Sequence, residues 1–288
     1  MAEKRIKVRK WLRDQLNNKW RSGYGKSKNK GIHNETPYIH SENTYNTYLA
    51  QCNHFADWCM ANGIKYANEA YLKVAEYGEW MADQGKSAWT IHTAIAAIAK
   101  AYGVSTTKFG YTAPKRERMA VKRSRYAAER DRHFSVSNNK ELIVFASCTG
   151  LRRHELESLH GNQLTIGENG QLQLFNIKGK GGKVRTIDII GSEAEIELIK
   201  KRMALSGAGL VFSHVHSAFD EHYYRSIYAC RAYKSKARPV EDIPDKDKYI
   251  CRKDKAGIIY DRRAMLYASM QLGHNRIDVI ANSYLHNL

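Results

Sequence analysis

The spacing of apolar residues in the first third of the chain predicts a small bundle of helices. Over residues 41–63 apolar side chains recur at i, i+3, i+4 and i+7, the spacing that places them on one face of an α-helix. A second helical stretch covers 69–82, and a third covers 87–103, with Ser87 as the candidate N-cap. We therefore expect residues 41–114 to form a helical domain.

The second half of the chain combines helical and strand patterns. Two helical stretches between 142 and 159 meet at Thr149-Gly150, and another helix is expected over 192–205. Between them, strand-like runs over 172–177 and 184–190 flank a glycine-rich turn, which predicts a β-hairpin. The predicted fold class is mainly α with a small β-hairpin or sheet (α+β), and residues 135–288 form its second domain.

Two further segments are basic and poor in core residues. Residues 1–40 are expected to be a basic N-terminal arm, with a short helix around Trp11, that either follows DNA phosphates or is a solvated tail. Residues 115–134 are expected to be a basic linker between the domains. A linker that crosses a duplex would contact DNA through Lys115, Arg116, Arg118, Lys122, Arg123 and Arg125. A connector that is merely soluble would not need so much charge of one sign.

The overall charge points to a polyanionic partner. The chain has 288 residues, with 47 Lys plus Arg against 29 Asp plus Glu, and its isoelectric point is near 9.6. Nucleic acid is the first candidate partner and an anionic membrane the second. Because no apolar run approaches the length of a membrane span or the core of a signal peptide, we expect a soluble, cytoplasmic protein.

The five cysteines, an odd number with no CxxC pair, suggest neither a disulfide framework nor a zinc site. Three short motifs and a tyrosine carry the candidate chemistry. They are TGLRRHEL at 149–156, GKGGKVR at 179–185, LGHNRIDV at 272–279 and Tyr284, ten residues after the histidine of the third motif. Each is weak alone: the glycine-rich turn, for example, lacks the strict pattern of a nucleotide-binding P-loop.

In this order, the four features resemble the tyrosine recombinase (phage integrase) family. The resemblance implies a tyrosine-recombinase catalytic domain over 135–288, preceded by a helical core-binding domain over 41–114 that clamps DNA. It also implies the site residues. Arg152 takes the first arginine position, Glu155 the acid that orients its neighbours, Lys180 the hairpin lysine, His274 the histidine of Leu-Gly-His, and Tyr284 the nucleophile.

The remaining family motif, His-x-x-Arg, matches His222 and Arg225, which would share one helix face. The match departs from the family pattern in that Tyr224 replaces the usual Leu and Ser226 the usual His.

The distance from Arg225 to His274 is about twice the family's usual separation, which implies an insertion near 231–257. The rival arginines, Arg262 and Arg263, have no histidine three residues before them.

By this resemblance, the tyrosine attacks a DNA phosphodiester and forms a covalent 3′-phosphotyrosyl intermediate. Arg152 and Arg225 would hold the phosphate oxygens, and Lys180, with a lowered pKa, would protonate the leaving 5′-oxygen. His222 would accept the tyrosine proton or assist the acid, and His274 would hold a phosphate oxygen. The reaction would need no metal, other cofactor or ATP.

The expected function is therefore that of a site-specific recombinase, the integrase of a mobile genetic element in a prokaryotic cell. Its expected partners are double-stranded DNA attachment sites, three further copies of the chain in a tetramer that passes through a Holliday junction, and an accessory directionality factor, with no membrane. Four residues follow Tyr284 in this sequence, which leaves little chain for the C-terminal helix that many relatives donate to a neighbour. The alternatives are a dimer-resolving recombinase of the same chemistry, a type IB topoisomerase, or a catalytically silent DNA-binding regulator on the same scaffold.

Overall fold

The computed structural model describes residues 7–21, 37–117, 133–179, 182–252, 255–285 and 288. The chain divides into two compact units, residues 1–120 and 121–288, each of which is described by itself. No helix among the described residues is long and apolar enough to cross a membrane.

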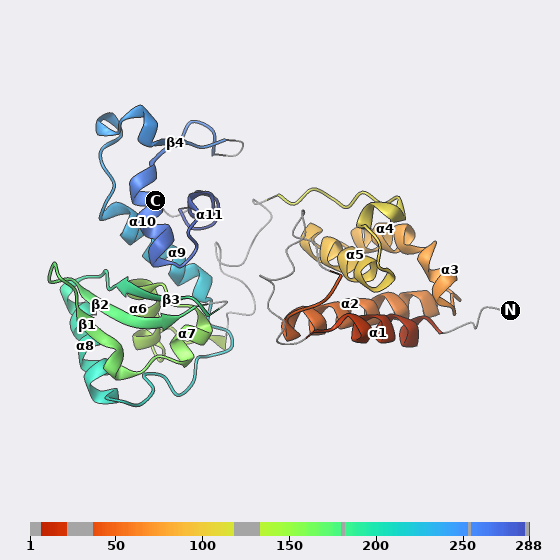
Figure 1. The fold of residues 1–288 in the computed structure, drawn as a ribbon, viewed down its shortest axis with the longest axis horizontal. Coiled ribbons are helices and arrows are strands. Elements are labelled where there is room, and N and C mark those ends of the chain that lie inside the picture. Colours follow the sequence, from red (N-terminus) through yellow and green to blue (C-terminus); the bar gives the residue numbers. More distant parts are fainter. Residues whose placement is uncertain (1–6, 22–36, 118–132, 180–181, 253–254, 286–287) are drawn as a thin grey trace. The chain divides into compact units, whose positions relative to one another are not determined.

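The first unit is a bundle of helices (Figure 1). Its elements are α1 (Val8–Lys19), α2 (Glu42–Ala61), α3 (Ala67–Tyr71), α4 (Val74–Asp83), α5 (Ala88–Tyr102) and a 3₁₀ turn, η2 (Thr106–Phe109). Phe55, Tyr77, Ile91 and Ile98 are among the side chains that fill its core. Burial of these apolar faces is the main stabilisation that such short helices have in water.

The helix boundaries follow local signals in the sequence. Ser41 and Ser87 each accept a hydrogen bond of 3.2 Å from the backbone N–H three residues later, and so cap α2 and α5. Gly103, with a left-handed φ of 71°, ends α5. The single helix expected over 69–82 is instead two, α3 and α4, separated at Leu72 and Lys73.

The expected basic arm over 1–40 differs from the structure in its first part. Val8, Leu12 and Leu16 are spaced along one face of α1 and are buried in the core of the bundle. The Lys19 ammonium also donates to the carbonyl oxygens of Lys100 and Ala101, at 2.7 and 2.9 Å. The apolar face of this segment outweighs its charge, so α1 belongs to the bundle. Residues 1–6 and 22–36 of the expected arm lie outside the described residues.

The second unit contains both sheets of the described chain. Its elements are α6 (Lys140–Thr149), α7 (Arg153–Glu157), η5 (Gly161–Gln163), β1 (Leu164–Ile166), β2 (Leu172–Lys178), β3 (Val184–Asp188), α8 (Glu193–Ser206), α9 (Glu221–Lys234), η7 (Val240–Asp242), η8 (Asp245–Asp247), β4 (Lys248–Ile250), β5 (Ile259–Asp261), α10 (Arg262–Gln271) and α11 (Ile277–Ser283). The predicted fold class, mainly α with a small β part, is confirmed.

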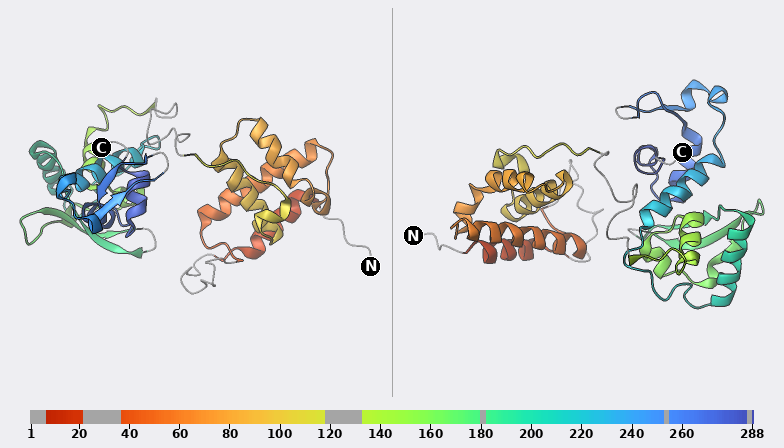
Figure 2. Two further views of the ribbon diagram at one scale, coloured as in Figure 1. Left: turned by 90° about the horizontal axis from the view of Figure 1, so that it is seen from above. Right: turned by 180° about the vertical axis from the view of Figure 1, so that it is seen from behind.

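The expected hairpin is β2 and β3, which pair antiparallel, with β1 added on the other side of β2. The sheet with α6, α7 and α8 forms one part of this unit, and α10 and α11 with the β4–β5 hairpin form the other (Figures 1 and 2). Helix α9 packs against both α6 and α10 and so joins the two parts. Leu151 and Leu174 are buried in the core of the first part, and Met265 and Ile280 in that of the second.

Gly150 closes α6 in a conformation that a larger residue strains. Its φ is 59°, and an added Cβ would lie 2.3 Å from the Tyr228 ring and 2.8 Å from a Leu272 methyl group. We predict that Gly150→Ala lowers the free energy of unfolding by about 2–5 kcal/mol, from left-handed strain and overpacking together.

Gly170→Ala is the matched control, because Gly170 also has a positive φ, of 74°, but an added Cβ meets nothing within 4 Å. Its expected cost is about 1–2 kcal/mol, from backbone strain alone. Urea denaturation of both variants measures the difference. Equal costs at the two positions would show that the contacts with Tyr228 and Leu272 do not matter.

Candidate active site

The first motif is held by the junction between α6 and α7. Helix α6 ends at Gly150, and Arg152 is the residue immediately before α7. The Glu155 carboxylate reaches back to accept a hydrogen bond of 2.8 Å from the backbone N–H of Arg152. This capping contact satisfies an N–H group that the helix itself leaves unpaired, and it places the Arg152 side chain beside Glu155.

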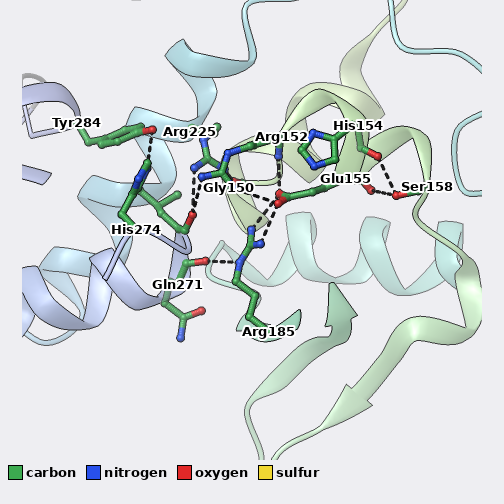
Figure 3. Close-up of polar contacts among 11 residues, drawn as sticks. Gly150, Arg152, His154, Glu155, Ser158, Arg185, Arg225, Gln271, His274 and Tyr284 are labelled. Atoms are coloured by element: carbon green, nitrogen blue, oxygen red, sulfur yellow. Dashed lines mark hydrogen bonds and ion pairs between the residues drawn. The ribbon is translucent and has the colours of Figure 1, made fainter. Parts of the chain in front are cut away.

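Glu155 is a buried carboxylate between two arginines (Figure 3). Its side chain has no exposed surface and accepts hydrogen bonds from Arg152 at 3.1 Å and from Arg185 at 2.8 and 2.9 Å. Burial alone raises the pKa of Glu155, but the hydrogen bonds and charge of Arg185, with the Arg152 N–H, outweigh it and lower the pKa to about 2. Glu155 is therefore ionised and orients both guanidiniums.

The Leu-Gly-His motif forms the opposite side of the site. The Leu272 side chain is fully buried, while its carbonyl oxygen accepts hydrogen bonds of 3.3 Å from both Arg152 and Arg225. Gly273 follows in a left-handed conformation with φ of 72°, which ends α10 and turns the chain. His274 is then fixed by the hydrogen bond of its backbone N–H to the Ser269 carbonyl at 2.9 Å.

Arg225 projects from α9 into the centre of the site and has no exposed surface. It donates to the carbonyl oxygens of Gly150 and Leu272, and its guanidinium carbon lies 5.7 Å from the centre of the Tyr284 ring. Its Nε atom has no hydrogen-bond partner among the described residues. The guanidinium is thus hydrogen-bonded to two main-chain segments and covered by the phenol ring.

Tyr284 and His274 form a direct pair. The His274 Nε2 atom lies 3.0 Å from the Tyr284 hydroxyl oxygen, and Tyr284 is 6% exposed. Burial lowers the pKa of His274 to about 4, and the positive charges of Arg225 and Arg152 add to the effect. The imidazole is therefore neutral at pH 7, so that it can either accept the phenol proton or donate its own to the phenol oxygen.

His222 and the hairpin lie at the edge of this group. His222 is in the first turn of α9, and its pKa is lowered by desolvation and by the charge of Arg225. Lys180 lies outside the described residues, but its neighbour Gly179 reaches the site. A Cβ added to Gly179 would lie 3.0 Å from an Arg185 nitrogen and 3.3 Å from a Glu155 oxygen.

The structure thus brings together five of the expected site residues from three parts of the sequence. They are Arg152, Glu155, Arg225, His274 and Tyr284. The rival arginines lie elsewhere: Arg263 pairs with Asp247 at 3.0 Å, and Arg262 lies 6.0 Å from the Tyr249 ring centre.

Of the six linker residues expected to contact DNA, two are described. Lys115 and Arg116 belong to the first unit, where Arg116 lines an open groove of about 390 Å³. Arg118, Lys122, Arg123 and Arg125 lie outside the described residues.

Sequence reasoning missed Arg185 as a member of the site. Its side chain bridges Glu155 and the Gln271 carbonyl oxygen, the latter at 3.1 Å. The available signal was its place at the end of the GKGGKVR motif, on the strand that returns from the hairpin turn. Only the fold shows that this strand passes beside the buried carboxylate.

This set of groups is suited to a bound anion and an oxygen nucleophile. Three guanidiniums face one carboxylate, so that the charge of the site is positive, and a phenol lies against a neutral imidazole. Among the described residues, no group of three or more His, Cys, Asp or Glu side chains could hold a metal ion.

Comparison with known proteins identifies the fold. No protein-family model and no curated protein matches the sequence. The solved structure of the Tn1549 transposon integrase in complex with circular intermediate DNA is similar to 98% of this chain and 96% of its own, with 13% identity and a TM-score of 0.51. A variant of that integrase, also with a circular intermediate DNA, has 12% identity, the same coverage and a TM-score of 0.53.

The chain therefore has the tyrosine recombinase fold, as the order of its motifs predicted. The integrase of the Tn1549 transposon is a solved protein with this fold.

The Glu155 ion pairs also generate a prediction about stability. Arg185→Ala leaves a buried carboxylate with one remaining arginine, and we expect it to lower the free energy of unfolding by about 3–5 kcal/mol at pH 7. Glu155 has a depressed pKa, so its contribution is complete above about pH 4.3 and is lost as the pH falls toward 2. Adding Glu155→Gln should recover part of the loss.

Arg276→Ala is the control, because it removes an exposed ion pair with Asp278 and should cost less than about 1 kcal/mol. Urea unfolding between pH 3 and pH 7 measures both variants. A cost for Arg185→Ala no larger than that of Arg276→Ala would mean that Arg152 alone satisfies Glu155.

Another prediction concerns the pKa of His274. Its ring nitrogens should titrate near pH 4 in the folded protein, well below the usual value of about 6.5, as followed by nitrogen NMR. As the pH falls, the His274 ring is protonated in the unfolded chain before it is protonated in the folded protein. His274 therefore stabilises the fold fully above about pH 6.5 and progressively less as the pH falls toward 4. Arg152→Met removes one positive charge and should move the pKa of His274 upward. Titration of wild-type His274 near pH 6.5 would contradict the burial argument.

Proposed function

We propose that this chain is a site-specific DNA recombinase, which cleaves and rejoins DNA through a 3′-phosphotyrosyl intermediate. The observation that carries the proposal is the contact of the Tyr284 phenol with both a neutral imidazole, His274, and a buried guanidinium, Arg225. A nucleophilic oxygen beside groups that bind an anion is the arrangement that phosphoryl transfer needs.

The arginines act on the scissile phosphate. Its non-bridging oxygens gain negative charge in the transition state, and guanidiniums donate paired hydrogen bonds while staying charged at any working pH. Arg152 and Arg225 meet at one acceptor, the Leu272 carbonyl oxygen, so a single phosphate can lie within reach of both. Glu155, which is itself paired with Arg185, holds Arg152 from the other side.

In this structure the Tyr284 ring covers the anion-binding group Arg225. Arg225 is fully buried beneath the Tyr284 ring, and a phosphate that binds Arg225 has to displace this ring. Entry of DNA therefore turns the phenol away from the guanidinium and toward the phosphorus. The loss of the contact with Arg225 is offset by the charge-assisted hydrogen bonds that the phosphate brings.

The cleavage step includes two proton transfers, one from the Tyr284 oxygen and one to the 5′-oxygen. As the Tyr284 oxygen bonds to phosphorus, its proton passes to a base, and His274 is the imidazole that already touches this oxygen. The expectation was instead that His222 accepts this proton or assists the acid, while His274 holds a phosphate oxygen. An anionic phosphate beside His274 raises the imidazole's basicity from its depressed value. The P–O5′ bond breaks, and Lys180 is the residue proposed to protonate the 5′-oxygen.

The reverse reaction joins a second DNA. The phosphotyrosine retains the energy of the broken bond, so a 5′-hydroxyl from another duplex can displace Tyr284 without ATP or metal. The likeness of the fold to the Tn1549 transposon integrase supports an integrase of a mobile element rather than a dimer-resolving recombinase. Exchange between two duplexes calls for a tetramer, and an accessory factor would set its direction.

The first unit is proposed to hold DNA as well. Its open groove is lined by Arg116 and by polar side chains near the N-terminal ends of α2 and α5, among them Asn43, Thr44 and His92. Helix N-termini and arginine both attract phosphate oxygens. A net charge of +18 over the whole chain favours binding to DNA in general.

The decisive test is a covalent adduct that depends on Tyr284. Wild-type protein mixed with a pool of randomised duplexes that each carry a nick should form DNA adducts that survive denaturing electrophoresis, and sequencing of the trapped DNA should reveal one site. Tyr284→Phe should abolish adducts while it leaves the affinity for that site within about twofold, since only the hydroxyl is lost.

Other results would point to other functions. DNA binding without adducts in the wild type would identify a catalytically silent regulator. Adducts without recombinant junctions between two labelled duplexes would favour a type IB topoisomerase.

A further inference from the structure

The segment between α9 and α10, residues 235–261, is anchored at both of its ends. Arg238 near its start donates to the carboxylate of Asp261 at its end, at 2.6 and 2.8 Å, and to Asp247 at 2.9 Å. Asp261 is fully buried and also caps α10 through the Arg263 N–H at 2.9 Å. Hydrogen bonds from Arg238 lower the pKa of Asp261 to about 2, so this anchor stays charged. This connector, which overlaps the expected insertion near 231–257, thus has a fixed base.

The connector then folds into the β4–β5 hairpin, which fixes the side chains of Lys255 and Tyr260. Tyr249 pairs with Tyr260 across the strands, and the Tyr260 ring packs edge-on against Tyr233 of α9, with 5.6 Å between ring centres. Beyond the strands, the Ile258 N–H donates to the Lys255 carbonyl at 3.2 Å across a turn in which Gly257 has a φ of 88°. A positive φ at the third position is typical of a type II turn and favours glycine. Lys255 and Tyr260 therefore project from a braced scaffold.

Together, these two side chains reach the main chain before and after Tyr284. The Lys255 ammonium donates to the carbonyl oxygens of Ala281 and Leu285, at 3.0 Å each, and the Tyr260 hydroxyl donates to Leu285 at 3.1 Å. These carbonyls lie at the C-terminal end of α11, where a helix leaves its last acceptors unpaired and favours a positive charge. The connector thus caps the helix that carries the proposed nucleophile.

We propose that Lys255 and Tyr260 are positioning residues for Tyr284, a role that rests on the proposed function. The phenol contacts Arg225 through its ring and His274 through its hydroxyl, and an entering phosphate has to disturb both contacts. The two connector side chains hold the backbone at Ala281 and Leu285, which the phosphate does not touch. The Tyr284 ring can therefore rotate away from Arg225 while the Cα atom of Tyr284 stays in place. Reaction geometry is sensitive to small displacements, so this fixed backbone keeps the phenol oxygen in line with the phosphorus.

The test compares variants of the full-length protein on the trapped site. Lys255→Met and Tyr260→Phe each remove donors to the α11 end, and we expect the single-turnover rate of adduct formation to fall by about 10- to 100-fold, with DNA affinity within about twofold. Lys255→Arg should recover much of the rate, because it restores a cationic donor. Hydrogen exchange at the amides of residues 280–285 should become faster in Lys255→Met than in the wild type without any DNA present.

Lys246→Met is the matched control, since it removes one exposed positive charge from the same connector. It should leave both the rate and the exchange unchanged. Unchanged or faster adduct formation in Lys255→Met and Tyr260→Phe, beside a wild type that forms adducts, would overturn the positioning role and leave the proposed function standing. An absence of adducts in the wild type would instead contradict the proposed function, and the exchange measurement would still report whether the connector holds α11.

Discussion

The burial of one carboxylate determines how this site is built. Glu155 has no exposed surface, so its charge requires partners, and it finds them in Arg152 from its own helix turn and in Arg185 from β3. The sheet is thereby tied to the α6–α7 junction, and Arg185 continues to the last carbonyl of α10. Loss of either arginine leaves the buried carboxylate with a single partner, and loss of the carboxylate leaves both arginines without their counter-ion. The site is therefore also a structural element of the domain.

Local chemistry in the sequence predicted most of the helices. Ser41 and Ser87 are N-caps and Gly103 is a C-terminal stop, all of which depend on residues within one turn of the helix end. The resemblance to tyrosine recombinases placed Arg152, Arg225 and Tyr284 in one site, and their side chains lie together in the structure. The cap interactions span only a few residues, whereas the contacts that bring the motifs together join residues as much as 120 positions apart in the sequence.

What the sequence did not predict depends on contacts between distant segments. Charge along residues 8–19 suggested an arm, but the three apolar residues of α1 find a core that the later helices supply. Arg185 joins the site only because β3 runs beside Glu155, 30 residues away in sequence. The burial of Arg225 was equally hard to predict, since the Tyr284 ring that covers it belongs to the last part of the described chain.

The acceptor that unites Arg152 and Arg225 is a main-chain atom, the Leu272 carbonyl oxygen. Point mutations replace side chains and leave such an atom in place, so no single substitution deletes it directly. Its position depends instead on the length of α10 and on the glycine that ends it. This part of the site tolerates a change of residue type at 272 that preserves packing, but it is vulnerable to the gain or loss of a single residue in the preceding helix, which would rotate the carbonyl away by about 100°.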